Sequence, residues 1–92
     1  MEPNAAVGLP AAVLRSVRRL TQRRGRDLAG KFLVEGRQAV REAISAGTVV
    51  EEVIVDDPAR HADLLSGLRV PIWRAAEHEM RQLSDTVTPQ GI

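Results

Sequence analysis

Apolar and polar residues recur with a helical period over residues 10–22. Val13, Val17 and Leu20 are spaced so that their side chains fall on one face of an α-helix. We therefore predict a helix that starts at Pro10, because the N–H that proline lacks has no partner in a first helical turn. The opposite face of this helix carries cationic side chains: Arg15, Arg18 and Arg19.

Three short apolar runs have the composition of β-strands, and they cover residues 31–35, 52–55 and 70–73. The first two runs lack strict alternation, which is typical of strands that are covered on both faces. The third run contains Pro71, which cannot donate a hydrogen bond to a neighbouring strand. We therefore expect the third strand to lie near an edge of the sheet.

Helical spacing returns after each of these runs. It indicates helices over residues 37–46 and 58–67, and a last helix that turns Met80 and Leu83 inward. The alternation of helices and strands predicts an α/β fold. Specifically, we expect a three-layer α/β/α sandwich around a small sheet that is mostly parallel or mixed.

Turn-forming residues mark the limits of these elements. Gly36 permits a sharp turn into a helix, and Gly47 is a natural left-handed stop. Asp56-Asp57 before Pro58 has the form of a helix N-cap followed by a first-turn proline. The predicted organisation is a flexible leader over residues 1–9, one domain over 10–84, and a linker over 85–92 that leads into a further domain.

The composition limits the chemistry of the chain. Its 92 residues suffice for one domain, and 43% hydrophobic with 27% charged residues is typical of a globular protein. With no cysteine and only two histidines, we expect neither disulfides nor a transition-metal site. No apolar run approaches the roughly 18 residues that cross a bilayer, and the start lacks a secretory signal. We therefore expect a cytoplasmic protein without membrane contact.

Charge is distributed unevenly along the chain. Residues 1–47 hold nine basic and four acidic residues, whereas residues 48–92 hold four and eight. The basic residues concentrate in the first predicted helix and in a following loop that we expect Gly25 and Gly30 to break. Such a density indicates a surface that contacts phosphate. The predicted RNA-binding residues are Arg15, Arg18, Arg19, Arg23, Arg24, Arg26, Lys31 and Arg37.

Plainer explanations of the arginines stay open. A cationic stripe is also what a solvated helix face presents, and a GC-rich genome also produces an excess of Ala and Arg. Arg37 and Arg41 lie one helical turn apart and repel each other unless an anion lies between them. We interpret Glu35 as a structural residue that orients Arg26 or Arg37 by a charge-assisted hydrogen bond.

The remaining candidates for chemistry have structural interpretations. Asp56-Asp57 after a strand suggests a metal or phosphoacceptor site, but helix capping is the simpler explanation of both residues. We expect His61 and His78 to be exposed helix residues, and no motif of a hydrolase surrounds them. Phe32 and Trp73 are the only aromatic residues, and we expect both in the core.

Two segments of the chain match a known pattern. Residues 26–36 contain an arginine, a glycine and the run Phe-Leu-Val-Glu-Gly, and they are followed by Val40 and Glu42-Ala43. Residues 83–92 form the second segment, which runs from Leu83 through Thr-Pro-Gln-Gly to Ile92. Together they resemble the substrate-binding domain of SpoU-type ribosomal RNA ribose methyltransferases, and its junction with the catalytic domain. The resemblance spans about residues 13–92.

The resemblance implies a three-layer fold like that of a small ribosomal-protein family of RNA binders. It also implies a following trefoil-knotted domain that binds S-adenosylmethionine, supplies the catalytic arginine and asparagine motifs, and forms the main homodimer contact. None of those motifs occurs in these 92 residues. We therefore expect a monomeric domain that binds large-subunit ribosomal RNA, holds no cofactor and is inactive without its catalytic partner domain.

Two other functions stay open at this point. The first is a free-standing RNA-binding protein of the same fold. The second is a dimerisation module, in which the acidic second half of one copy meets the basic first half of another.

Overall fold

The computed structural model describes residues 7–83, which build a small α/β fold around a sheet of three parallel strands. The strands are β1 (Val7–Gly8), β2 (Val53–Val55) and β3 (Ile72–Arg74), in the order β1-β3-β2. The helices are α1 (Ala11–Arg18), α2 (Arg23–Ala29), α3 (Arg37–Ser45), α4 (Ala62–Leu65) and α5 (Glu77–Leu83), with 3-10 turns η1 (Arg19–Thr21) before α2 and η2 (Pro58–His61) before α4.

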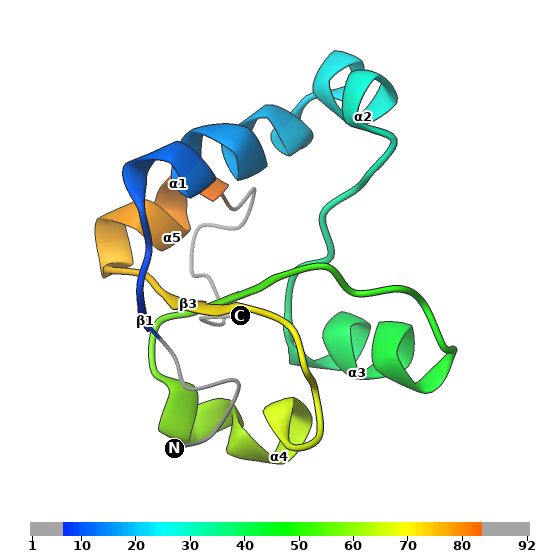
Figure 1. Ribbon diagram of the computed structural model, residues 1–92, viewed down its shortest axis with the longest axis vertical. Helices are drawn as coiled ribbons and strands as arrows, with labels where there is room; N and C mark the ends of the chain where they lie inside the picture. The colour runs from blue at the N-terminus through cyan, green and yellow to red at the C-terminus, as the bar shows by residue number, and fades with distance from the viewer. Residues whose placement is uncertain (1–6, 84–92) are drawn as a thin grey trace.

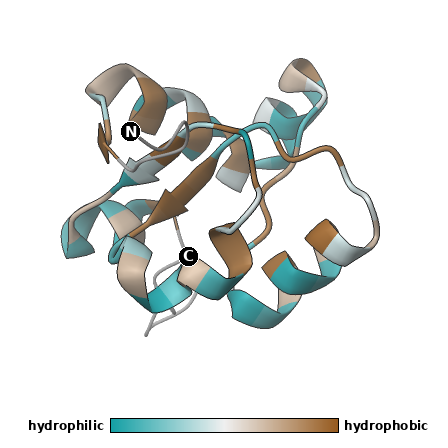
Figure 2. Ribbon diagram, turned by 60° about the horizontal axis from the view of Figure 1, so that its bottom comes forward, coloured by the Kyte–Doolittle hydropathy of each residue, from teal (hydrophilic) through white to brown (hydrophobic). Residues whose placement is uncertain are grey.

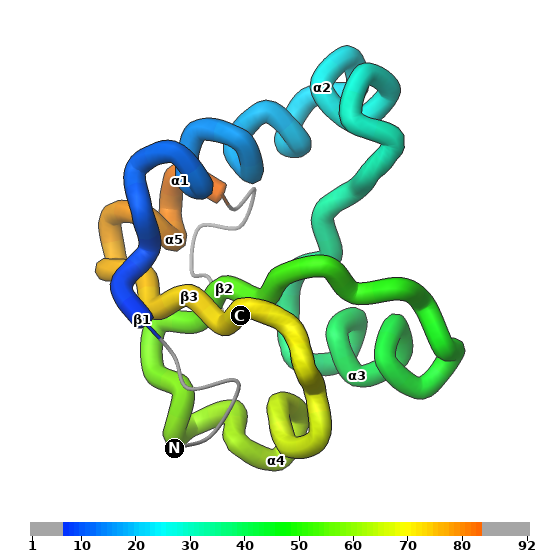
Figure 3. Tube along the Cα trace, viewed as in Figure 1, coloured from blue at the N-terminus to red at the C-terminus, as the bar shows by residue number. Residues whose placement is uncertain are grey.

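The helices lie on both sides of the strands. Figure 1 shows α1 and α5 together on one side, with α3 and α4 on the other. The tube in Figure 3 shows β1 and β2 flanking β3. The α/β class and the parallel pairing predicted from the alternation of elements are confirmed.

The main core lies between the sheet and α4. Val53 and Val55 share one face of β2, because alternate residues of a strand point the same way. They pack with Ile72 of β3 and with Leu64 and Leu65 of α4, and all five side chains are buried. In Figure 2 much of the sheet is accordingly brown, although one strand ends in teal, and much of the helical surface around it is teal.

A second group of buried residues joins α1 and α5. Val17 and Leu20 are buried on the α1–η1 segment, and Met80 and Leu83 are buried on α5. Each pair is three residues apart, so its members lie on the same helical face. The inward orientation predicted for all four residues is confirmed.

The predicted helix boundaries hold well. The helix expected over residues 10–22 is α1 followed by η1, and those expected over 37–46 and 58–67 are α3 and the η2–α4 pair. Asp57 caps η2 as expected, since its Oδ1 accepts a hydrogen bond of 3.1 Å from the Ala59 N–H. In residues 7–83 no helix has the length and apolar character that crossing a bilayer demands.

The strand predicted over residues 31–35 is wrong. Gly30, at φ 68°, ends α2 in the left-handed conformation, and the extended residues after it stay outside the sheet. The third place in the sheet belongs to β1, which we had assigned to a flexible leader and which pairs with Trp73 and Arg74. Phe32 is therefore 65% exposed and does not join the core. An apolar run favours pairing, but tertiary context decides which segment meets the sheet.

The position predicted for the third strand is also wrong. β3 is the central strand, although Pro71 suggested an edge. Pro71 immediately precedes the first residue of β3, and its carbonyl accepts a hydrogen bond of 3.0 Å from the Val53 N–H. The missing proline N–H thus lies outside the ladder, where it does not prevent pairing on both sides.

Gly25 lies inside helix α2 and does not break it, contrary to the loop that we predicted there. A Cβ at this position would overlap the backbone carbonyl oxygen and carbon of Arg19 in η1. The glycine thus allows α2 to approach η1 closely, and Gly30 is the residue that ends the helix.

We expect Gly25→Ala to destabilise the protein, because a backbone carbonyl cannot rotate away from the added methyl as a side chain could. Overpacking of this kind costs about 1–3 kcal/mol, which lowers the Tm of a domain of this size by roughly 5–15 °C. Thermal unfolding followed by circular dichroism measures the change. Gly8→Ala is the matched control, since its Cβ would meet nothing within 4 Å. Equal Tm values for both variants would contradict the close approach.

Candidate nucleic-acid interface

Arg15 and Arg18 of α1 and Arg19 of η1 are exposed. The same segment buries Val17 and Leu20 on its other side. This is the two-sided helix that the apolar period predicted, with an inward apolar stripe and an outward cationic one.

Helix α2 extends the cationic surface beyond the end of α1. Arg23 and Arg24 are both exposed. The Arg23 Nε lies 3.8 Å from Asp27 Oδ2, but 88% and 72% of the two side chains are exposed. A solvated pair of this kind is weak and opens readily for another anion. We call the five exposed arginines of this surface the arginine arm: Arg15, Arg18, Arg19, Arg23 and Arg24. In Figure 1, α2 continues from α1 and lies far from α4.

Arg26 and Lys31, two further predicted RNA-binding residues, make contacts within the protein. Arg26 is half-buried and its Nη1 donates a hydrogen bond of 3.1 Å to the Leu20 carbonyl, which ties α2 to η1. Lys31 is exposed and its Nζ lies 3.1 Å from Glu51 Oε1. Arg26 thus helps to position the arginine arm, and Lys31 joins the segment after α2 to the segment before β2.

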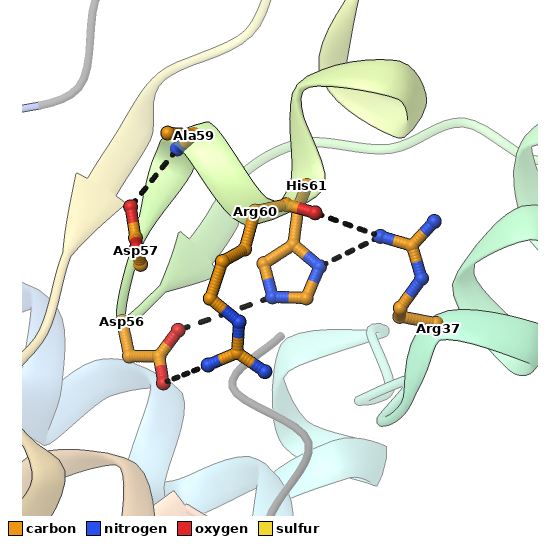
Figure 4. Close-up of polar contacts among 6 residues, drawn as sticks. All are labelled: Arg37, Asp56, Asp57, Ala59, Arg60 and His61. Atoms are coloured by element: carbon orange, nitrogen blue, oxygen red, sulfur yellow. Dashed lines mark hydrogen bonds and ion pairs between the residues drawn. The ribbon is translucent and has the colours of Figure 1, made fainter.

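Arg37, the eighth predicted RNA-binding residue, lies on α3 and apart from the arginine arm (Figure 1). Its Nη2 lies 2.6 Å from Asp63 Oδ2. Its Nη1 lies 2.9 Å from His61 Nδ1 and donates a hydrogen bond of 3.3 Å to the Arg60 carbonyl (Figure 4). The Arg41 guanidinium lies 3.6 Å from the same Asp63 oxygen. Asp63 is therefore the anion between the two arginines, and the hydrogen bond from Arg37 holds the pKa of Asp63 below its ordinary value.

His61 is 1% exposed, so our expectation of an exposed histidine there is wrong. Because a guanidinium only donates hydrogen bonds, the contact with Arg37 requires His61 Nδ1 to accept and places the proton on Nε2. Nε2 faces Asp56 Oδ1 at 3.9 Å, and neither atom has a hydrogen-bond partner among residues 7–83. Burial first, and then the charges of Arg37 and Arg60, lower the pKa of His61.

The other residues singled out in the sequence have clear positions. His78 is exposed as expected. Trp73 is half-buried, and its Nε1 donates a hydrogen bond of 2.6 Å to Glu52 Oε2. The role predicted for Glu35, of orienting Arg26 or Arg37 by a charge-assisted hydrogen bond, stays a prediction. Across residues 7–83, no three His, Asp or Glu side chains gather where they could hold a metal ion.

The chain matches the sequence profile of the MRM3-like substrate binding domain over residues 12–92. Because the match covers most of its length, the chain belongs to this family. It is also 30% identical over 76 residues to the 23S rRNA (guanosine(2553)-2′-O)-methyltransferase RlmP of Bacillus subtilis strain 168. The aligned part is 82% of this chain and 30% of that enzyme, so the chain spans less than a third of its relative. The interpretation of the chain as a substrate-binding domain is confirmed.

We expect the protein to lose stability as the pH falls below the ordinary His61 pKa of 6.5. Because the pKa of His61 is lowered in the folded state, the unfolded chain takes up the proton at a higher pH than the folded protein. The stability that this difference contributes is therefore present above pH 6.5 and is lost as the pH falls from there through the lower pKa of the folded state. The loss cannot exceed about 1.4 kcal/mol per pH unit. Urea unfolding between about pH 7.5 and 5.5 measures it.

The variant His61→Gln separates this histidine from the carboxylates that also titrate in acid. We expect its stability to depend less on pH than that of the wild type, whereas His78→Gln, at an exposed site, retains the wild-type dependence. A His61→Gln protein with the full wild-type pH dependence would show that another group titrates.

Proposed function

We propose that this chain holds ribosomal RNA for an S-adenosylmethionine-dependent methyltransferase that modifies a ribose 2′-hydroxyl. The observation that carries the proposal is the arginine arm, with its five exposed guanidinium groups on consecutive short helices. Membership of a substrate-binding family and similarity to a 23S rRNA 2′-O-methyltransferase support it.

The arginine arm has the properties of a phosphate-binding surface. Within residues 7–83, Arg15, Arg18, Arg19 and Arg24 form no ion pair, and the single pair of Arg23 is solvated. Guanidinium groups bind phosphate oxygens through two parallel hydrogen bonds. Contacts of this type set the position of an RNA without reading its bases. The arm therefore supports a role in holding and orienting the transcript.

In this proposal, methyl transfer takes place on a separate domain of a longer protein. That domain binds S-adenosylmethionine and forms the homodimer, whereas this chain is monomeric, holds no cofactor and is inactive alone. The ribose oxygen must lie in line with the methyl group and its leaving sulfur. Fixing the RNA in this position makes an encounter of two molecules effectively unimolecular. We propose that this binding of ribosomal RNA takes place in the cytoplasm.

We expect RNA binding by this chain to weaken steeply with salt. If four arginines of the arm contact phosphates of unpaired RNA, the slope of about −0.7 per contact predicts roughly fifty-fold weaker binding between 50 and 200 mM salt. Fluorescence anisotropy with a labelled single-stranded fragment of 23S rRNA measures the Kd. A Kd that stays constant over this range would rule out phosphate contacts as the main source of affinity.

Substitutions in the arm test which arginines bind. We expect the double variant Arg23→Ala/Arg24→Ala to make the slope of log K against log salt shallower by about 1.4, because two contacts are lost. Adding Arg18→Ala and Arg19→Ala should abolish most of the affinity. Arg69→Ala/Arg81→Ala is the matched control, since it removes the same charge from exposed residues outside the arm. Equal slopes for the two double variants would remove the arm from the proposal.

A further inference from the structure

The arginine arm bends where the α1–η1 segment meets α2. Gln22 has extended backbone angles, φ −116° and ψ 144°, between two helical segments, so the chain changes direction at this residue. Some guanidinium groups of the arm lie before the bend and the others follow it on α2. Their relative positions therefore depend on how firmly the bend is held. We call residues 18–26 the elbow of the arm.

Hydrogen bonds within the elbow satisfy the last carbonyl groups of the first helical segment. The Thr21 Oγ1 donates to the Arg18 carbonyl at 2.8 Å. The Gln22 N–H donates to the Arg19 carbonyl at 3.3 Å. The last carbonyls of a helix lack intrahelical partners, so contacts of this kind decide how the helix ends and where the chain goes next. The bend is thus a hydrogen-bonded structure and not a loose connection.

Arg26 makes the contact that spans the elbow, and it does so with a charged group. Its Nη1 donates to the carbonyl of Leu20, whose side chain is buried in the core beside α5. A guanidinium at the carbonyl end of a helix also interacts favourably with the helix dipole. The Arg26 backbone carbonyl accepts hydrogen bonds from the N–H groups of Gly30 at 2.9 Å and Lys31 at 3.3 Å. One residue therefore both anchors α2 to η1 and closes the carboxyl end of α2.

The surroundings of Arg26 differ from those of the arm. Arg26 is half-buried, whereas Arg23 and Arg24 on the same helix are exposed. Its neighbour Gly25 lies so close to the backbone of Arg19 that a Cβ would overlap it. The hydrogen bond from Arg26 crosses this same interface between α2 and η1. A guanidinium that donates to a carbonyl inside the fold contributes to the shape of the arm, while the solvated guanidiniums supply its free charge.

We propose that Arg26 is a positioning residue, which holds the two parts of the arginine arm in the arrangement that binds phosphates, and that Thr21 assists it. The inference rests on the proposed function, since it explains how the arm presents its charges to RNA. When only a fraction of the molecules has the binding-competent arrangement, the apparent Kd rises in inverse proportion to that fraction. A firm elbow keeps the fraction high. Arg26 thus increases the affinity for RNA without contacting a phosphate.

NMR relaxation of the free protein tests the elbow in the absence of RNA. We expect Arg26→Ala to lower the backbone order parameters of α2 from about 0.85, the value of a rigid backbone, towards about 0.6. The order parameters of β3 should stay unchanged, which shows that the variant is folded. Arg24→Ala is the matched control, because it removes the same charge from an exposed site on the same helix. Equal order parameters of α2 in the two variants would overturn the inference.

Thr21→Val loosens the elbow without a change of charge, because it removes the hydroxyl that donates to the Arg18 carbonyl and keeps a branched side chain. Thr21→Ser keeps the hydroxyl and is its matched control. We expect Thr21→Val to raise the Kd for single-stranded 23S rRNA by roughly two- to tenfold, the effect of one hydrogen bond, and Thr21→Ser to bind like the wild type. Equal Kd values for the two variants would contradict the role of Thr21.

The salt dependence of RNA binding separates positioning from contact. We expect Arg26→Ala to raise the Kd about tenfold with the wild-type slope of log K against log salt, since the number of phosphate contacts stays the same. Arg24→Ala removes a proposed contact and should make the slope shallower by about 0.7. The same loss of slope in Arg26→Ala would make Arg26 a phosphate contact and overturn the inference. A wild-type Kd that is independent of salt would contradict the proposed function instead, and the order parameters of α2 would still decide whether Arg26 holds the elbow.

Discussion

The pairing of β2 with β3 is the contact on which the rest of the fold depends. β3 lies at the centre and joins β1 to β2, and the buried side chains of Val53, Val55 and Ile72 hold this pair against α4. Removing these side chains from water is the main favourable term in a domain this small. Because all three strands are parallel, each leads into its helix at the same edge of the sheet. This arrangement brings α1 and α5 side by side (Figure 1).

Arginine has two different roles in this protein, and the surroundings of each guanidinium decide which. Arg37 joins α3 to the η2–α4 segment through Asp63 and the buried ring of His61, so its charge is balanced within the fold. The arginines of the arm are solvated, which leaves their charge available for an external anion. Neutral His61 is compatible with this arrangement, because a protonated ring would place a second cation beside Arg37.

Helix α1 has two different faces. Its apolar face, with Val17, lines a cavity of about 360 Å³, and its cationic face, with Arg15 and Arg18, points to solvent. The fit between α2 and η1 at Gly25 sets the direction in which the arm continues beyond α1. A change in core packing can therefore move the arginines without touching them.

Features that depend on near neighbours were predictable from the amino-acid order. The positions of α1, α3 and the η2–α4 pair, the Asp57 cap and the inward faces of α1 and α5 follow from periodicity, capping and proline geometry, which act within a few residues. The arginine arm was also visible, because its members are close in the chain and lie on predicted helices or directly after them.

Features that depend on the meeting of distant segments were decided only in the folded protein. Two short segments, β1 and residues 31–35, were candidates for the third place in the sheet, and β1 is the one that pairs with the free edge of β3. Arg37 and His61 lie 24 positions apart in the chain, and nothing near either residue indicates that this guanidinium will meet a buried ring. Likewise, only the close approach of η1 explains why a glycine, Gly25, lies inside helix α2. Such choices follow from which surfaces exclude water together, and a residue's neighbours in the chain do not contain that information.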